Sequence, residues 1–454
     1  MSNIPNIFRL KAAIQEYDWG KPGNSSLVAK YAPTSVGKDY KVDENKCYAE
    51  IWMGTHPKGT ASLWDEPQVS LRGLVMSSSG SFIGDQLVTS TQTHQAKFAN
   101  STEVPFLFKI LSIGKALPLQ AHPDKKLGES LNDADPAQFV DANHKPEIAV
   151  ALNDGFRGFV GFREPQLIAR DLQNVPEVRE LINDDSLLEE FSKELDRGSL
   201  KVILTKLLQL DPNYVSHSIA KLVSRLERQG PSAIVGNEEA ASSIKLLNNQ
   251  YPGDIGVIVV PFFMNLISLN RGEAIYIGAD EAHAYLEGNI VECMAVSDNV
   301  LNAAFVPPET RNLSTFLSAL TYTSRSPSYY TLPASPYSRS EMGKTVAFDP
   351  PLEEFTVLWT RLTGSPSTGS GPSPISVQKR LDEEYEGKEV LCAVDGPTIG
   401  IVTMGKVSIE EQSAKRESVE LEEGGIVFVK PGSGLVIQVI GEDNAEIWWS
   451  TCVE

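Results

Sequence analysis

The stretch GEAIYIGADEAH, Gly272–His283, decides the fold that this sequence predicts. It reads as a glycine, five strand-forming residues and a glycine turn. The same arrangement returns as GIVFVKPGSGLV at Gly425–Val436. A strand-and-turn pattern that occurs twice in a chain of 454 residues indicates two β-rich domains of similar construction.

The two copies differ at the residue that could bind a metal. The first copy ends in His283, whereas the second has Val436 at the equivalent position. His283 is also the last of the six histidines in the chain. A metal bound by imidazole therefore belongs to the first domain, and we expect the second domain to have a packing role.

Both copies resemble the second conserved motif of the cupins, which are small jelly-roll barrels. This resemblance implies a mainly β fold with two cupin-type jelly-roll barrels, the first metal-binding and the second without metal ligands. The segment from Gly256 to Asn299 is predicted to consist of strands. The low-complexity run from Gly364 to Pro374 is predicted to be a flexible loop.

The segment from Glu164 to Gln250 differs from the rest in its periodicity. Ile219, Leu222, Val223 and Leu226 follow the i, i+3, i+4, i+7 spacing of an amphipathic helix. Within the segment, Asn-Asp, Arg-Gly and Asp-Pro pairs separate this helix and the other predicted helices from one another. We therefore expect a discontinuous catalytic barrel at 1–163 and 256–335, an inserted α-helical domain at 164–255 and a C-terminal barrel at 336–454.

Composition limits the possible partners and compartment. A hydrophobic content of 41% and a charged content of 22% are ordinary for a soluble protein. The net charge of −19 argues against nucleic acid and anionic membranes, and no apolar run is long enough to span a bilayer. Four scattered cysteines without a CxxC motif suit reduced thiols. We expect a cytoplasmic monomer.

Polar residues gather in the stretch from Lys115 to Glu147. In an extended strand, Gln120 and His122 would point to the same face. A jelly-roll barrel brings its two motifs together at its mouth, so these side chains can converge with His283. Glu147, at the head of the strand pattern KPEIAVAL, would complete four ligands. Two imidazoles, one amide oxygen and one carboxylate form a set that Zn²⁺ accepts.

Several segments together resemble the type I phosphomannose isomerases, and the match runs from about Tyr17 to Asn299. These segments are YDWG, EIWMGTHP, LQAHPDKKL, NHKPE and EAHAYLEGNIVECMAVSDN. The resemblance implies the interconversion of mannose 6-phosphate and fructose 6-phosphate, with a hexose phosphate as the small-molecule partner. It also implies one Zn²⁺ per chain, held by the residues at Gln120, His122, Glu147 and His283.

The implied reaction moves a proton between neighbouring carbons through a cis-enediol, so it needs a base, proton carriers and an anion clamp. We expect Glu292 to be the base, on the next inward strand after His283, although it could instead accept a hydrogen bond beside the zinc ligands. The other predicted residues are Lys145 as electrostatic or acid partner and substrate ligand, His56, His144 and Asp298 in ring opening and proton relay, and Trp19 and Lys109 in substrate binding.

Two of these histidines have simpler interpretations. His56 follows a predicted strand end, where a loop can expose it, and it could be a surface histidine beside an interfacial tryptophan. His144 could merely support Lys145.

The chain departs from the family after the second motif. The family usually reads S-D-N-x-x-R-A-G-x-T-P-K, whereas this chain has SDNVLNAAFVPP. Asn302 therefore stands at the usual Arg position, and Pro308 replaces a Lys. An amide cannot replace a charged hydrogen bond, which contributes about 1.5–3 kcal/mol. Arg311 could supply the missing cation, or it could be a surface arginine.

Three functions remain open from the sequence. The first is an active isomerase. The second is a catalytically weakened or inactive relative that binds zinc and a sugar phosphate or partner as a regulator. The third is a cupin oxygenase with iron at the same ligands, against which Gln120 and the helical insertion both count.

Overall fold

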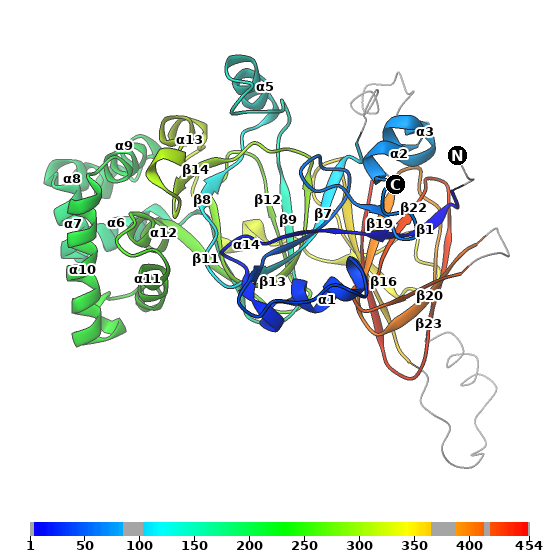
Figure 1. Cartoon of the computed structure of the whole chain (residues 1–454). Coiled ribbons are helices and arrows are strands. Elements are labelled where there is room, and N and C mark those ends of the chain that lie inside the picture. The colour runs from blue at the N-terminus through cyan, green and yellow to red at the C-terminus, as the bar shows by residue number, and fades with distance from the viewer. Residues whose placement is uncertain (1–3, 85–102, 365–386, 413–417, 453–454) are drawn as a thin grey trace, which may run out of the picture.

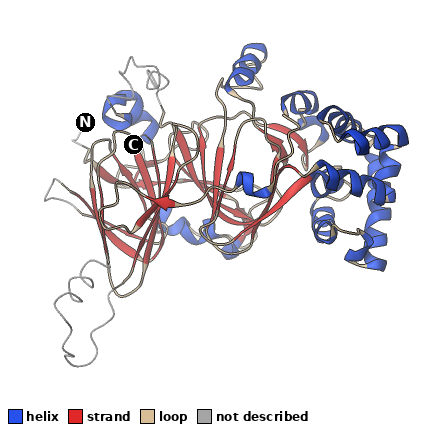
Figure 2. Cartoon of the chain, turned by 180° about the vertical axis from the view of Figure 1, so that it is seen from behind, coloured by secondary structure: helices blue, strands red, loops and turns tan. Residues whose placement is uncertain are grey.

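The described part of the chain forms an elongated molecule, with helices gathered at one end and β sheets in the middle and at the other end (Figures 1 and 2). The structure is a computed structural model that describes residues 4–84, 103–364, 387–412 and 418–452. The flexible loop predicted between Gly364 and Pro374 lies outside the described residues from 365 onward. Within the described residues, no helix combines the length and apolar character needed to cross a bilayer.

A 10-stranded sheet occupies the middle of the molecule. Its strand β7 is buried along its whole length because both faces of the sheet are covered. Phe106, Phe108 and Ile110 pack toward the C-terminal part of the chain, whereas Leu111 and Ile113 pack into the sheet's own interior. This alternation has the period of two expected for a strand. The strands are β2 (Ala13–Gln15), β5 (Glu50–Met53), β7 (Phe106–Ile113), β8 (Leu119–Ala121), β9 (Glu147–Ala151), β10 (Phe156–Phe162), β11 (Met264–Leu269), β12 (Ala274–Ile277), β13 (His283–Ala295) and β14 (Leu301–Ala304).

An 8-stranded sheet forms the other β part and includes two strands from the N-terminal region. β1 pairs antiparallel with β22, with Leu10 opposite Ile426, and β6 pairs with β1. Its strands are β1 (Ile7–Lys11), β6 (Ser62–Leu63), β15 (Ser335–Pro336), β16 (Thr345–Phe348), β17 (Thr356–Leu362), β19 (Thr398–Met404), β22 (Ile426–Val429) and β24 (Ala445–Thr451). The division of the chain at 163 and 336 stays a prediction, although these two N-terminal strands lie in the C-terminal sheet.

Smaller sheets and helices complete the β part. A 4-stranded sheet contains β18 (Lys388–Leu391), β20 (Lys406–Glu411), β21 (Val419–Glu422) and β23 (Leu435–Val439), and a 2-stranded sheet contains β3 (Lys21–Pro22) and β4 (Cys47–Tyr48). The helices outside the insertion are α1 (Leu27–Ser35), α2 (Leu71–Ser77), α3 (Ser79–Ile83), α5 (Lys125–Ala134), α13 (Leu313–Ala319) and α14 (Pro327–Tyr330), with short 3₁₀ turns η1 (Gly23–Ser25) and η4 (Pro308–Thr310). Both copies of the repeated motif form a strand, a turn and the start of the next strand, as predicted: β12 leads to β13, and β22 leads to β23.

One apolar cluster joins the two large sheets. It includes Phe108 and Val291 from the 10-stranded sheet and Phe8, Phe428 and Trp448 from the 8-stranded sheet. Each fully buried side chain of this size contributes about 1.5–3 kcal/mol relative to exposure in water. The C-terminal part is therefore firmly attached to the sheet that carries the predicted metal ligands.

The predicted helical insertion is confirmed, and its helix boundaries follow from local sequence. α10 begins after Asp211, whose carboxylate accepts hydrogen bonds from the amides of Asn213 and Tyr214, and Pro212 occupies its first position. Ile219, Leu222 and Leu226 face the helical core, as their spacing predicts. The elements are α6 (Pro165–Asn174), α7 (Pro176–Ile182), α8 (Asp185–Glu194), α9 (Arg197–Leu208), α10 (Pro212–Gln229), η3 (Pro231–Ala233), α11 (Glu238–Gln250) and α12 (Gly256–Phe263).

The strand prediction for the segment beginning at Gly256 is wrong over its first eight residues. Residues Gly256–Phe263 form the helix α12, and all eight are buried. A segment that is apolar on every side has no hydrophobic alternation to distinguish helix from strand. From Met264 onward the chain returns to strands, as predicted.

Candidate metal centre

Three side chains, at the ends of three separate strands, meet inside the 10-stranded sheet. One possible ligand atom from each of His122, Glu147 and His283 lies within 4.8 Å of the others, and all three residues are buried. His122 follows β8, Glu147 begins β9 and His283 begins β13. The backbone of His283 is paired with that of Gln120, which brings β8 and β13 together.

The hydrogen bonds of the two histidines leave one nitrogen of each available to a metal. Nδ1 of His122 lies 2.8 Å from the carbonyl oxygen of Asn299, and Nδ1 of His283 lies 3.1 Å from that of Glu281. A carbonyl only accepts, so each Nδ1 carries the proton and each Nε2 presents its lone pair. Both Nε2 atoms are buried and lack a hydrogen-bond partner. Nε2 of His122 lies 3.2 Å from Glu147 Oε1, but the two are not aligned as a hydrogen bond.

Protonation favours the same interpretation. Burial lowers the pKa of both histidines, that of His283 to about 4, so both rings are neutral near pH 7. Burial opposes ionisation of Glu147, but the groups around it, the cation Lys145 among them, outweigh burial and keep the pKa of the carboxyl well below its usual value. Two neutral imidazoles and one carboxylate are ligands that Zn²⁺ accepts.

Gln120 and Asn302 lie next to this cluster on the same face of the sheet. Gln120 is directly opposite His283 on one side and opposite Asn302 on the other. Residues directly opposite in an antiparallel pair share a face. Oδ1 of Asn302 is buried without a hydrogen-bond partner. Gln120 as the fourth ligand stays a prediction.

Glu292 lies on the same strand as His283, not on the next strand as predicted. A separation of nine residues would normally place the two side chains on opposite faces. The register of β13 against β10 shifts between Tyr285 and Glu287, which is a β-bulge. Gly288, with φ of 128°, follows, and a Cβ there would lie 2.7 Å from the Cα of Phe156. With the bulge between them, the side chains of His283 and Glu292 can both point to the buried interior.

Glu292 forms a buried ion pair with a predicted substrate ligand. Its Oε1 accepts from Nζ of Lys109 at 2.9 Å, and Oε2 of Glu50 lies 3.6 Å from the same Nζ. Burial raises the pKa of Glu292 to about 7, although Lys109 opposes the shift. Burial alone would lower the pKa of Lys109, but Glu292 and Glu50 raise it, so the amine stays charged. Trp52 Nε1 donates to Glu50.

His56 is buried, so the expectation that a loop exposes it is wrong. Its ring packs against Trp52 with centroids 4.9 Å apart. Nδ1 accepts from the amide of Lys58, and Nε2 lies 3.4 Å from Oδ1 of Asp298. The hydrogen bond from His56 lowers the pKa of Asp298 to about 2, so this aspartate is ionised near neutral pH.

Lys145 and His144 point to different partners. Nζ of Lys145 lies 3.6 Å from Oε1 of Glu147, one of the three candidate metal ligands. Nε2 of His144 donates instead to Oε1 of Glu354, at 2.8 Å. This contact fits the supporting role for His144, and its place in a proton relay stays a prediction.

Trp19 and Arg311 line a cavity of about 620 Å³ where the helical insertion meets the 10-stranded sheet. Pro308 and Lys115 also line it. The guanidinium of Arg311 donates to Asp254 at 2.7 Å, and Lys115 Nζ lies 4.1 Å from the ring centroid of Tyr251. Arg311 therefore faces a cavity but is already paired with a carboxylate.

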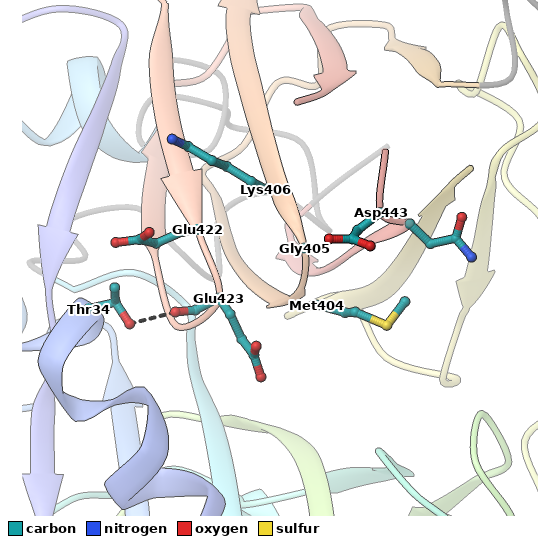
Figure 3. A pocket seen from close by; sticks show the side chains of 8 residues that line it. Thr34, Met404, Gly405, Lys406, Glu422, Glu423 and Asp443 are labelled. Atoms are coloured by element: carbon teal, nitrogen blue, oxygen red, sulfur yellow. Dashed lines mark hydrogen bonds between the residues drawn. The ribbon is translucent and has the colours of Figure 1, made fainter. Parts of the chain in front are cut away.

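Another hollow, of about 630 Å³, lies beside the C-terminal sheet (Figure 3). Thr34 Oγ1 donates to the backbone carbonyl of Glu423 at its edge. Its lining carries Glu422, Glu423 and Asp443 against the single cation Lys406. This acidic lining is unsuited to a phosphorylated sugar.

Sequence reasoning missed several residues around the centre. Glu50 and Trp52 alternate in the strand Glu50–Met53, and that alternation could have placed both on one face. Tyr285, which donates to Glu147 at 3.4 Å, lies two residues after His283 and could have been found in the same way. No local signal pointed to Glu354, because its partner His144 is 210 residues away in sequence.

The fold and the site define a class: a β-rich protein with an inserted helical domain, a buried candidate metal site and a buried Glu–Lys ion pair near it. Comparison with known proteins gives the family. Residues 7–165 match the catalytic domain of type I phosphomannose isomerase, and residues 174–264 match its helical insertion domain. The chain belongs to the type I phosphomannose isomerase family.

Curated relatives match along nearly the whole chain. It is 36% identical over 444 residues to the mannose-6-phosphate isomerase of Candida albicans, with 94% of each chain covered. It is 35% identical over 467 residues to that of Saccharomyces cerevisiae, with 100% of each covered. The crystal structure of mannose 6-phosphate isomerase from Salmonella typhimurium has a TM-score of 0.77 and 22% identity, covering 99% of this chain and 100% of that one. At this identity the structural likeness is one of fold.

Proposed function

We propose that this chain is a zinc-dependent isomerase that interconverts mannose 6-phosphate and fructose 6-phosphate by proton transfer through a cis-enediol. The observation that carries the proposal is the buried cluster of His122, Glu147 and His283, with both Nε2 atoms unpartnered. The Salmonella typhimurium relative is described as bound to substrate (f6p) and a zinc atom. The curated relatives named above are mannose-6-phosphate isomerases.

The residues present fit a zinc ion. Gln120, His122, Glu147 and His283 would hold it, and the buried Nε2 atoms would then have the partner that they lack within the protein. A zinc ion bound there would polarise substrate oxygens and offset the negative charge that develops on the enediolate.

Glu292 is the base in this proposal. A carboxylate with a pKa of about 7 is deprotonated often enough to act and still basic enough to take a proton from carbon. Lys109 holds the carboxylate in place and supplies a positive charge beside the developing enediolate. Burial of both residues excludes water from the proton transfer.

His56 and Asp298 are a pair suited to moving a proton between substrate oxygens. Asp298 fixes the ring through Nε2, and the amide of Lys58 fixes Nδ1. Lys145, beside Glu147, adds a positive charge at the edge of the site.

The pH dependence follows from Glu292. Only the ionised carboxylate accepts a proton, and burial has raised its pKa from about 4.5 to about 7. We expect kcat/KM to be lost as the pH falls through about 7, by about tenfold per pH unit. In Lys109→Met the acidic limb of the kcat/KM profile should move to higher pH, because Lys109 lowers the pKa of Glu292 and so opposes the effect of burial. A wild-type limb near pH 4.5 would contradict the assignment.

The cavity beside Trp19 is the proposed binding place for the substrate phosphate, with Arg311 as its cation. Arg311→Ala should raise KM by about tenfold to a hundredfold, since a charged hydrogen bond contributes about 1.5–3 kcal/mol. Asp254→Asn is the matched control, because it breaks the same ion pair and keeps the guanidinium. Equal effects of the two variants would mean that Arg311 only braces Asp254.

An isomerase assay on the purified, zinc-loaded chain tests the function directly. Mannose 6-phosphate should be converted to fructose 6-phosphate, and the reverse reaction should also proceed. Absence of turnover with zinc bound would favour the regulator, in which Asn302 and Pro308 have removed needed cations. Oxygen consumption by an iron-loaded sample would instead favour the oxygenase.

We also propose that the two β parts of the chain are jelly-roll barrels. The strand-turn-strand units at β12–β13 and β22–β23 support two jelly-roll barrels, the first with the metal ligands. The C-terminal copy has Val436 at the position of His283. A monomeric state and a cytoplasmic location complete the proposal and stay predictions.

A further inference from the structure

A buried carboxylate from the C-terminal region reaches the segments beside the metal centre. Glu354 lies in the loop between β16 and β17 and is only 5% exposed. Its Oε1 accepts from Nζ of Lys125 at 3.0 Å and from Nε2 of His144 at 2.8 Å. Oε2 accepts from the amide of Glu353 at 3.2 Å.

The two side-chain partners stand at matching places in the chain. Lys125 comes three residues after the ligand His122, and His144 comes three residues before the ligand Glu147. Between them, α5 projects from the β sheets (Figure 1), and residues 135–146 contain no helix or strand. The carboxylate of Glu354 therefore binds both ends of the segment 125–144, close to the candidate ligands His122 and Glu147.

Residues 135–146, which lead from α5 back to β9, are held by side-chain hydrogen bonds and not by strand pairing. Asp141 accepts from Ser297 Oγ at 2.8 Å and from the amide of Asp298 at 2.7 Å. Glu354 holds His144 from the C-terminal region. Lys145, next in sequence, has its Nζ 3.6 Å from Glu147, so a shift of His144 would move the cation beside the metal ligand.

Glu354 is charged, which strengthens its hydrogen bonds to Lys125 and His144. Burial opposes ionisation, but the hydrogen bond from His144 and the nearby charge of Lys125 lower the pKa of Glu354 to about 2. The carboxylate is therefore ionised near neutral pH. Hydrogen bonds to a charged group are stronger than those between neutral groups.

We propose that Glu354 is a positioning residue for the isomerase reaction, acting through His144 and Lys125 on Lys145 and on the ligands His122 and Glu147. The C-terminal region is then part of the catalytic machinery and not packing alone. This inference rests on the proposed function and deepens it. It does not require Glu354 to touch the substrate.

Glu354→Gln tests the inference. Substitutions that disturb the support of metal ligands typically cost about 10–100-fold in metal affinity or activity, and we expect about tenfold faster zinc release to a chelator. We also expect kcat to fall by about tenfold with KM changed by less than about twofold. Lys125→Met removes the more exposed partner and should speed zinc release in the same direction, even if Glu354→Gln does not fold. Glu420→Gln is the control, because it removes only a surface ion pair with Lys406.

Zinc release decides the outcome. Faster release in Glu354→Gln and Lys125→Met, with Glu420→Gln unchanged, supports the inference. Wild-type release rates in both variants would overturn it, even if their melting temperatures fell, because that pattern describes a purely structural contact. A wild-type chain without isomerase activity would defeat the proposed function instead, and the release rates would still decide the role of Glu354.

Discussion

Glu292→Gln is expected to lower kcat by about 10²–10⁴-fold while leaving zinc binding intact. An amide cannot take the proton that the carboxylate removes from carbon. Its oxygen can still accept the hydrogen bond that Lys109 donates to Glu292 at 2.9 Å, so the local structure should survive. Steady-state kinetics above pH 7, together with zinc content and melting temperature, measure all three properties.

A glutamate on the same strand provides the control for Glu292. Glu287 accepts from Arg157 at 2.6 Å and lies at the β-bulge, where its side chain is partly exposed. Glu287→Gln should keep kcat within about twofold, as is usual for a partly exposed ion pair. Normal turnover in Glu292→Gln would exclude it as the base and favour the alternative in which it only accepts a hydrogen bond beside the metal ligands.

His283→Ala is expected to weaken zinc binding by about two to three orders of magnitude and to remove most of the isomerase activity. Structural zinc sites with four ligands bind with about 10–16 kcal/mol, so the loss of one ligand costs about 3–4 kcal/mol, or two to three orders of magnitude in affinity. The melting temperature of the wild type should rise on zinc addition, because a ligand that binds the folded state stabilises it. His283→Ala should lose most of this rise.

An exposed histidine in the helical insertion is the matched control. His217 lies on α10 at an exposed position. His217→Ala should retain one zinc and the full thermal shift. Equal zinc retention in His283→Ala and the wild type would remove His283 from the ligand set.

The convergence of three candidate metal ligands could be predicted from the sequence because their signals are local. Gln120 and His122 are two residues apart, Glu147 heads a strand and His283 ends a repeated motif. Of these, His122, Glu147 and His283 meet in the structure. The helices of the insertion were predictable for the same reason, since caps such as Asp211 and the spacing of Ile219 and Leu222 lie within single segments.

Features that depend on distant contacts escaped prediction. The helix α12 is buried on all sides, so no periodicity marked it as helical. The strand of Glu292 was misplaced because a bulge near Leu286 changes which face each residue occupies, and no motif announces it. His56 is buried by Trp52 and Asp298, and the latter comes from the far side of the helical insertion.

We attribute the isomerase activity of this chain to a single zinc ion held by side chains that include His122, Glu147 and His283. Zinc should be titrated into the metal-stripped wild type while the conversion of mannose 6-phosphate to fructose 6-phosphate is followed, with His283→Ala in parallel. We expect activity to rise linearly to a plateau at about one equivalent of zinc in the wild type and to stay at background in His283→Ala. Activity that does not depend on zinc, or a zinc-saturated wild type without turnover, would contradict this attribution.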